Sequence, residues 1–327
     1  MRYLRLRKVK TVYLGESLTT VLSKPKDEDL IMSYTGSEST LSGWVLRDLT
    51  IDKAPIFVEN PKCVESLGGH PVELDYHVEV LGTEEDLSRK FNGVENLRMF
   101  WLHRFKSKAY IPHEGWSTVF KVMKSKIKTS RLYTSLSEVS VSDKTVKLEG
   151  GVFISYEKLI NTIPQKLFLS IVKSDDLPKT PLNDYVHIPL HITAVVTKNT
   201  SSVREGLVKV YSLGKKRYIP SHVVLYKTFD VEYTLNYVIT PLTSESIKSE
   251  LLSQAISTLK KLGVEVKPIY AIRTYFEPYG VLAGKPENVV KSLEKYDIEF
   301  RGRYGMWSEL SICDILRGFG LTTTELT

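Results

Sequence analysis

The chain has 327 residues, with 42% hydrophobic and 25% charged side chains, which is the composition of a globular protein with one large or two ordinary domains. No apolar run reaches the roughly 18 to 20 residues that a membrane-spanning helix requires. The basic N-terminus is not followed by the apolar core of a secretory signal. These features argue against a membrane-spanning or exported protein, and we expect a cytoplasmic one.

The net charge of +7 permits an anionic partner such as a nucleotide, a phosphate or a membrane surface, although a solvated lysine surface is the favoured explanation. Basic residues are dense only at 121–131, and no nucleic-acid motif accompanies them, so a nucleic-acid binder is the weakest alternative. Cys63 and Cys313 form neither a disulfide framework nor a metal-site spacing. We expect both to be packing residues, with no metal.

The N-terminal third predicts strands and one helix. Apolar residues at helical spacing place the helix at 40–49, and a strand on either side of it makes 30–60 a strand–helix–strand unit of the size of a βαβ crossover. The predicted elements of this region are two short strands within 1–23, a polar break at 24–29, a strand at 30–34, the helix at 40–49, a strand at 54–60 and a turn at 67–70.

The rest of the chain mixes sheets and helices. The clearest helix spans 244–263, with Thr243 or Ser244 as its cap and Gly263 at its end. The other predicted elements are a partly helical stretch at 84–106, a helix from about Trp116, a β-meander over 131–164, strands over 186–240, and two short strands plus a helix at 287–296 within 264–300.

A dinucleotide fold needs glycines after its first strand and an acid at the end of its second, because the backbone must approach a pyrophosphate and the acid binds the ribose. The loop at 35–41 places Thr35, Ser37 and Thr40 at the three glycine positions, with Gly36 between them. Glu59 lies about where the ribose acid belongs. The loop alone is a weak signal, and an ordinary βαβ crossover is the simpler interpretation.

Three later segments resemble flavin amine oxidases, protoporphyrinogen oxidases and UDP-galactopyranose mutases. Glu59 is followed by the pair Gly68 and Gly69, as in that family. The segment 110–127 resembles the family's "Y-P-x-G-G" segment, with Gly115 at the second glycine and Glu114 where a glycine often sits. The phrase at 156–164 resembles "yd-x-lI-x-T-x-P" through Tyr156, Leu159, Ile160, Thr162 and Pro164.

The tail at 300–319 is the most specific match. It resembles the family's "G-R-[FY]-G-x-W-x-x-L" flavin segment, and the matching residues are Gly302, Arg303, Tyr304, Gly305, Trp307 and Leu310. The resemblance implies that Leu136 presents its backbone to the adenine, that the neighbourhood of Arg303 lies against the pyrophosphate, and that a helix starting near Ser311 points at the flavin. The acid expected at this helix start falls on Cys313, with Asp314 one place later.

The resemblance also suggests where a substrate would lie. The segment 273–280 resembles the family's aromatic and proline segment before the tail, so Arg273, Tyr275 and Tyr279 are candidates for the lining of a substrate site. Packing of the sheet is the competing explanation for each. His70, His103 and His113 are expected to be ordinary histidines rather than catalysts.

The expected fold class is α/β, with a Rossmann-like FAD-binding domain and a second sheet-containing substrate domain. We expect residues 1–29 to be an N-terminal extension, 76–107 a partly helical insert, and 176–299 the substrate domain. The Rossmann-like domain would comprise 30–75, 108–175 and 300–327.

Two functions follow from the resemblance. One is an FAD-dependent oxidoreductase or mutase-like flavoprotein with a small-molecule substrate. The other is a non-catalytic descendant that has lost FAD and acts as a binding or scaffold subunit, with a protein partner or a second copy. The side chains at the glycine positions do not separate the two, because they would strain the loop but could instead hydrogen-bond phosphate. Glu38 beside a diphosphate would repel it, which favours loss of FAD.

Overall fold

The computed structural model describes residues 7–33, 39–47, 49–94, 102, 105–174, 182–198, 200–228, 232–243, 250–284 and 289–322. The chain divides into two compact units, each assembled from separate segments. Unit 1 comprises 1–39, 121–186 and 282–310, and unit 2 comprises 40–120, 187–281 and 311–327. No helix within the described ranges is long and apolar enough to cross a membrane.

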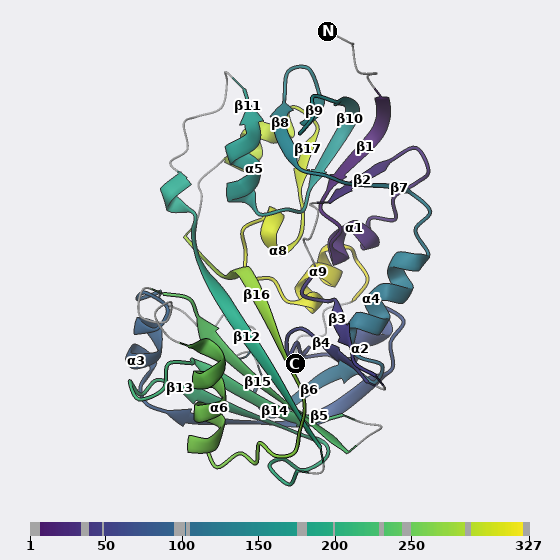
Figure 1. Ribbon diagram of the computed structural model, residues 1–327. Coiled ribbons are helices and arrows are strands. Elements are labelled where there is room, and N and C mark those ends of the chain that lie inside the picture. Colours follow the sequence, from purple (N-terminus) through teal and green to yellow (C-terminus); the bar gives the residue numbers. More distant parts are fainter. Residues whose placement is uncertain are drawn as a thin grey trace. The chain divides into compact units, whose positions relative to one another are not determined.

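Unit 1 is built on an eight-stranded sheet whose order is β11-β8-β9-β10-β1-β2-β7, with β17 also paired to β10 (Figure 1). Five of these strands, β17, β10, β1, β2 and β7, form one continuous parallel set, and β11 pairs in parallel with β8. The strands are β1 (Arg7–Leu14), β2 (Leu30–Ser33), β7 (Ser130–Tyr133), β8 (Leu136–Ser140), β9 (Thr145–Leu148), β10 (Phe153–Asn161), β11 (Val172–Lys173) and β17 (Ile298–Phe300).

The order in which the chain adds parallel strands to the sheet reverses at β1. From β1 the chain moves outward through β2 to β7, and it then returns to form β10 on the other side of β1. In open parallel sheets ligands bind at the carboxyl ends of the strands beside such a switch point. In this unit the switch point lies where Leu14 pairs with Asn161.

Short helices connect these strands, and buried aliphatic residues of β1, β2, β8 and β10 form the core together with Phe168 of α5 and Leu293 of α7. The α5 helix packs against β8. The helices and the 3-10 turn of unit 1 are α1 (Leu18–Leu22), α5 (Gln165–Ile171), η2 (Leu182–Asp184), α7 (Val289–Glu294) and α8 (Gly302–Gly305). The α4 helix (Trp116–Ser125) contributes its last five residues to this unit.

Unit 2 contains a seven-stranded sheet in the order β16-β12-β15-β14-β13-β5-β6 and a small antiparallel pair, β3 with β4. Its strands are β3 (Gly43–Val45), β4 (Thr50–Asp52), β5 (Pro71–Leu81), β6 (Lys108–Pro112), β12 (Val186–Lys198), β13 (Leu207–Leu213), β14 (His222–Lys227), β15 (Tyr233–Pro241) and β16 (Ile269–Ala283). Its helices are α2 (Pro61–Glu65), α3 (Glu84–Arg89), α6 (Leu251–Lys261) and α9 (Ile312–Gly318).

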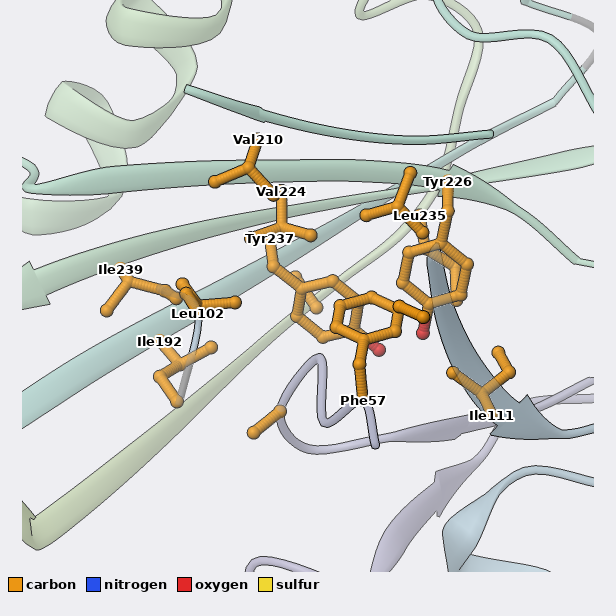
Figure 2. Close-up of a cluster of buried hydrophobic side chains, with 14 of the residues drawn as sticks. Phe57, Leu102, Ile111, Ile192, Val210, Val224, Tyr226, Leu235, Tyr237 and Ile239 are labelled. Carbon is orange, nitrogen blue, oxygen red and sulfur yellow. The ribbon is translucent and has the colours of Figure 1, made fainter. Parts of the chain in front are cut away.

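The larger core of unit 2 lies on one face of this sheet and is rich in aromatic rings. Figure 2 shows Phe57, Tyr226 and Tyr237 at its centre, and the Phe57 and Tyr226 rings meet edge to face with centroids 5.6 Å apart. A second core includes Ala255 and Leu259 of α6 together with residues of β12 to β15. Alternation of buried residues along β12 supplies both cores, as expected for a strand covered on both faces.

Several predicted elements are confirmed. A helix begins at Trp116, α7 lies inside the predicted 287–296, and α3 supplies the helical part of 84–106. The helix predicted at 244–263 is present from Leu251 to Lys261, and 244–249 lie outside the described residues. The α/β fold class is likewise confirmed.

Other predictions are wrong. The predicted helix at 40–49 is absent from the described residues there, which contain β3 paired with β4; the close approach requires glycine, because a Cβ on Gly43 would lie 2.6 Å from both the Ile51 carbonyl oxygen and the Ser117 hydroxyl oxygen. Residues 54–60 form one isolated bridge, Val58 with Tyr110, rather than a strand. The unit 30–60 is therefore no βαβ crossover.

Residues 7–29 are not an extension of the Rossmann-like unit. They supply β1, which pairs in parallel with both β10 and β2, and α1, which leads from β1 into β2. The helical part of this segment is only five residues long, too short for the periodicity that would identify it from sequence. The first strand of the fold is thus β1, one strand earlier than predicted.

The two cysteines are not independent packing residues. Cys63 in α2 and Cys313 in α9 form a disulfide across 250 residues of sequence, and both side chains are buried in unit 2. Their wide separation gives no sequence pattern that indicates a pairing.

Candidate functional site

The loop from β1 to α1 lies at the switch point of the parallel sheet and is the structural counterpart of a dinucleotide-binding loop. It reads Gly15-Glu16-Ser17, and Thr20 stands at the third glycine position. A Cβ on Gly15, which has a φ of +99°, would lie 2.7 Å from the Thr162 hydroxyl oxygen, so only glycine fits there. Of the predicted phosphate loop 35–41, residues 35–38, which include Gly36, lie outside the described residues, and Thr40 belongs to unit 2.

Two side-chain hydroxyls lie at the carboxyl ends of β1 and β10 and are bonded within the protein. The Thr20 hydroxyl donates to the carbonyl of Gly15 at 2.6 Å, and the Thr162 hydroxyl donates to the carbonyl of Leu14 at 2.8 Å. The two hydroxyl oxygens lie 3.3 Å apart, and both side chains are buried. Polar protein atoms therefore occupy the space that a third glycine would leave open.

The α1 helix is capped by its own chain. The Ser17 hydroxyl accepts a hydrogen bond from the Thr20 amide at 3.3 Å, and Ser17 has a φ of −104°, which any residue adopts. A helix of one turn has a weak dipole, because the dipole sums over aligned peptide groups. This end of α1 resembles an ordinary capped helix rather than a phosphate cradle.

Glu16 contributes a buried carboxylate to the same loop. One of its oxygens lies 2.6 Å from the Lys124 ammonium, and the other accepts from Nε of Arg131 at 2.8 Å. The Glu16 side chain is only 7% exposed. The two cations nearest to this carboxylate are thus already compensated within the protein.

The tail motif closes unit 1 through two tight approaches. A Cβ on Gly302, which has a φ of +73°, would overlap the Thr19 hydroxyl oxygen, and a Cβ on Gly305 would overlap the Asn161 carbonyl oxygen. These contacts join α8 to α1 and to the end of β10. Both glycines of the predicted motif therefore have a packing requirement inside the protein.

The other two tail residues also have protein partners. Arg303 donates to the Glu309 carboxylate through Nε at 3.2 Å and through Nη2 at 2.8 Å, and the Glu309 side chain is 9% exposed. Trp307 is buried, donates to the Ala283 carbonyl at 3.0 Å and packs edge to face on Tyr185. The Arg303 guanidinium thus faces a carboxylate where the family resemblance implies a pyrophosphate.

Glu59 does not lie at the end of a second parallel strand. It precedes α2 in unit 2, and its carboxylate accepts from Arg317 at 3.1 Å. Gly68 and Gly69 follow the same helix, and a Cβ added at Gly69 would lie 3.0 Å from a methyl carbon of Val119 and of Val64. These predicted cofactor residues build the surroundings of α2.

The remaining predicted residues are also accounted for. Leu136 begins β8, and its side chain lies in the core of unit 1. Gly115 and Glu114 precede α4 in unit 2, where the Glu114 carboxylate bonds His70. The predicted helix start at Ser311 is confirmed, because Ser311 and Asp314 form a capping box at the start of α9. His103 lies outside the described residues.

The predicted substrate residues lie on β16 in unit 2. The Tyr275 hydroxyl donates to the Glu277 carboxylate at 3.0 Å, and the Tyr279 amide donates to the same carboxylate at 3.1 Å. Arg273 is exposed and bonds a neighbouring backbone carbonyl. The Lys53 ammonium lies 5.2 Å from the centre of the Tyr275 ring. Sequence reasoning missed Glu277 and Lys53, because nothing in their spacing marks them as buried.

Burial perturbs two neighbouring charged groups in unit 2. The pKa of Asp52 is raised by burial, and the amides of Ser117 and Trp116, which donate at 2.8 and 3.0 Å, oppose that rise. The pKa of Lys53 is lowered by burial. Asp52 thereby accepts hydrogen bonds from the first two amides of α4, although it lies more than 60 residues earlier in the sequence. Within the described ranges no group of three or more histidine, cysteine or acidic side chains could hold a metal ion.

The residues at the carboxyl edge of the parallel sheet do not fit the diphosphate of FAD. One of three glycine positions is glycine, the first helix has a single turn, and the Thr20 and Thr162 hydroxyls are bonded within the protein. In addition, the last residue of β2 within the described ranges, Ser33, is not the acid that binds the ribose in such folds.

Known structures share this fold at low sequence identity. A reduced UDP-galactopyranose mutase matches with a TM-score of 0.72 and 12% identity, over 98% of this chain and 96% of that one. A putative protoporphyrinogen oxidase from Exiguobacterium matches with a TM-score of 0.66 and 11% identity, over 97% of this chain and 98% of that one. Putrescine oxidase bound to putrescine matches with a TM-score of 0.61 and 9% identity, over 97% of this chain and 99% of that one.

No protein-family model matches the sequence, and a search of curated proteins gave no match. The structural matches cover nearly the whole of each chain, so they concern the complete architecture rather than one shared unit. The chain therefore shares the fold of these UDP-galactopyranose mutase, protoporphyrinogen oxidase and putrescine oxidase structures, as the sequence segments had indicated.

Proposed function

We propose that this protein is a non-catalytic descendant of the flavoprotein fold, which works by binding a partner or ligand rather than by flavin chemistry. The observation that carries the proposal is the state of the β1–α1 loop. Ser17 caps the helix, and the hydroxyls of Thr20 and Thr162 are bonded within the protein at the switch point. A diphosphate bound there would displace hydrogen bonds that the protein already makes. Buried hydroxyls left without a hydrogen-bond partner would then destabilise the complex.

The tail motif is compatible with this proposal. Gly302 and Gly305 are required by Thr19 and Asn161, and Arg303 is paired with Glu309. The strongest family signal in the sequence thus has a structural role that needs no cofactor. Fold similarity alone does not carry activity.

The second candidate is an FAD-dependent oxidoreductase or mutase-like flavoprotein. Nearly complete coverage by structures of UDP-galactopyranose mutase and putrescine oxidase favours it. Under that hypothesis the cofactor would be held mainly by residues other than the β1–α1 loop, and Tyr275 and Tyr279 would remain candidates for a substrate site.

Uptake of FAD distinguishes the two. The purified protein is incubated with excess FAD, desalted, and measured for visible flavin absorption and for flavin released on denaturation. We expect no retained flavin. Retention of about one flavin per chain would refute the non-catalytic proposal.

A variant with restored glycines serves as the matched comparison. Ser17→Gly with Thr20→Gly removes the cap and the hydroxyl that bonds the Gly15 carbonyl. If these side chains are what prevents binding, the folded double variant should retain more FAD than the wild type. Equal absence of flavin from both would place the obstacle elsewhere in the loop.

A further inference from the structure

The Glu16 carboxylate has an unusual setting for a residue in a phosphate-binding type of loop. It directly follows Gly15 at the switch point, and its side chain is buried between Lys124 from α4 and Arg131 from β7. In such loops the protein normally offers donors and positive potential to an external anion. In this chain the loop itself provides the anion.

The position of Arg131 explains why a negative charge is needed there. Its Nη2 donates to the carbonyl of Lys124 at 3.0 Å, and Nη1 and Nη2 both reach the carbonyl of Ile127, at 3.3 and 3.4 Å. These carbonyls lie in the last turn of α4 and just after it, where the helix dipole favours a cation. Arg131 is thus fixed by the fold, with its Nε directed at Glu16.

We propose that Glu16 is a built-in counter-ion that occupies the anion-binding capacity of Lys124 and Arg131 beside the β1–α1 loop. Two cations contact one carboxylate, so removal of its charge takes a compensating anion away from both in a largely buried place. An inorganic anion with several oxygens is then the natural replacement. This inference rests on the proposed function, because it assumes that the wild-type loop holds no dinucleotide.

The test uses Glu16→Gln, which keeps the size of the side chain and removes its charge. Inorganic pyrophosphate is titrated into the wild type and the variant, by calorimetry and by the shift of the melting temperature. We expect pyrophosphate to bind the variant at least tenfold more tightly than the wild type and to restore its melting temperature. Added salt should weaken this binding, and Lys124→Met in the same variant should abolish it.

Glu28→Gln is the matched control. Glu28 also pairs with a lysine, Lys10 at 2.8 Å, but both side chains are more than half exposed. The same change in net charge at that place should leave pyrophosphate affinity at the wild-type level. An equal gain in affinity would assign the effect to overall charge and overturn the proposal.

Two further results would overturn it. One is a folded Glu16→Gln variant that does not bind pyrophosphate, which would leave Glu16 as a structural clamp only. The other needs no variant at Glu16: if the wild type already binds pyrophosphate and Lys124→Met abolishes that binding, the cations are open to external anions. FAD retained by the wild type would refute the proposed function instead. In that case flavin contacts outside this loop would hold the cofactor, and pyrophosphate alone would still fail to bind the wild type.

Discussion

The disulfide between Cys63 and Cys313 provides the sharpest test of the architecture of unit 2. It connects α2 to α9 across 250 residues, so the crosslink restricts most of the unfolded chain. The chain-entropy relation for a closed loop of that length gives roughly 5 kcal/mol of stabilisation at 25 °C. Because a whole domain is typically stable by only about 5 to 15 kcal/mol, loss of this bond should be evident.

The perturbation is Cys63→Ala with Cys313→Ala, measured beside the wild type with and without reductant. Urea unfolding followed by tryptophan fluorescence gives the free energy of unfolding for each. We expect both reduction and the double substitution to lower that free energy by a few kcal/mol. The slope of the unfolding free energy against urea should also increase, because the unfolded chain is less constrained.

The disulfide also predicts the number of free thiols in the wild type. Under denaturing but non-reducing conditions a thiol reagent should find no free thiol, because the two cysteines are the only ones in the chain. Two reactive thiols in that assay would refute the pairing. A disulfide that is present but whose reduction leaves the urea midpoint unchanged would refute the loop-entropy argument instead.

Two further predictions concern the buried charges of unit 2. Asp52→Ala removes the acceptor for the amides of Ser117 and Trp116, so it should lower the free energy of unfolding in urea by roughly 1 to 3 kcal/mol. Asp52→Asn should lower it less, and an unchanged urea midpoint would contradict this role. Because burial lowers the pKa of Lys53, the unfolded state holds its proton to higher pH, so stability should rise as pH increases toward 10.5, and Lys53→Met should remove that rise from the pH profile.

The fold could be predicted from sequence because the segments that carry the resemblance are spread along the chain. The phrase ending in Thr162 and Pro164 forms the end of β10 and the turn after it, and the tail from Gly302 forms α8 directly after β17. Both lie at the carboxyl edge of the parallel sheet. Their order therefore fixed the topology of unit 1 even though the first strand was misplaced.

The first strand was misplaced for a physical reason. After β1 the helix is a single turn, and its residues Thr19, Thr20 and Val21 are β-branched, so the sequence has strand character through a helical segment. The apolar run at 30–34 then carries the clearer signal. The choice of 30–34 as the first strand is what placed the predicted phosphate loop at Gly36 and the predicted ribose acid at Glu59.

The charged partners were beyond sequence reasoning for a different reason. Glu16 lies more than a hundred residues from Lys124 and Arg131, and Lys53 is similarly remote from Tyr275. Only the folded chain brings such groups together. Helical spacing and motif spacing report local geometry, and these contacts are not local.

The glycines that remain and those that are absent point to one explanation. Gly15, Gly302 and Gly305 each face atoms of the protein itself, so the fold requires them whether or not a cofactor binds. Ser17 and Thr20 stand where the family's glycines serve a diphosphate, and both use their hydroxyls within the loop. Under the proposed function, the tail motif persists for packing while the loop that would contact a ligand has changed. This is why the sequence resemblance predicted the architecture correctly, and why the same resemblance is weak support for flavin chemistry.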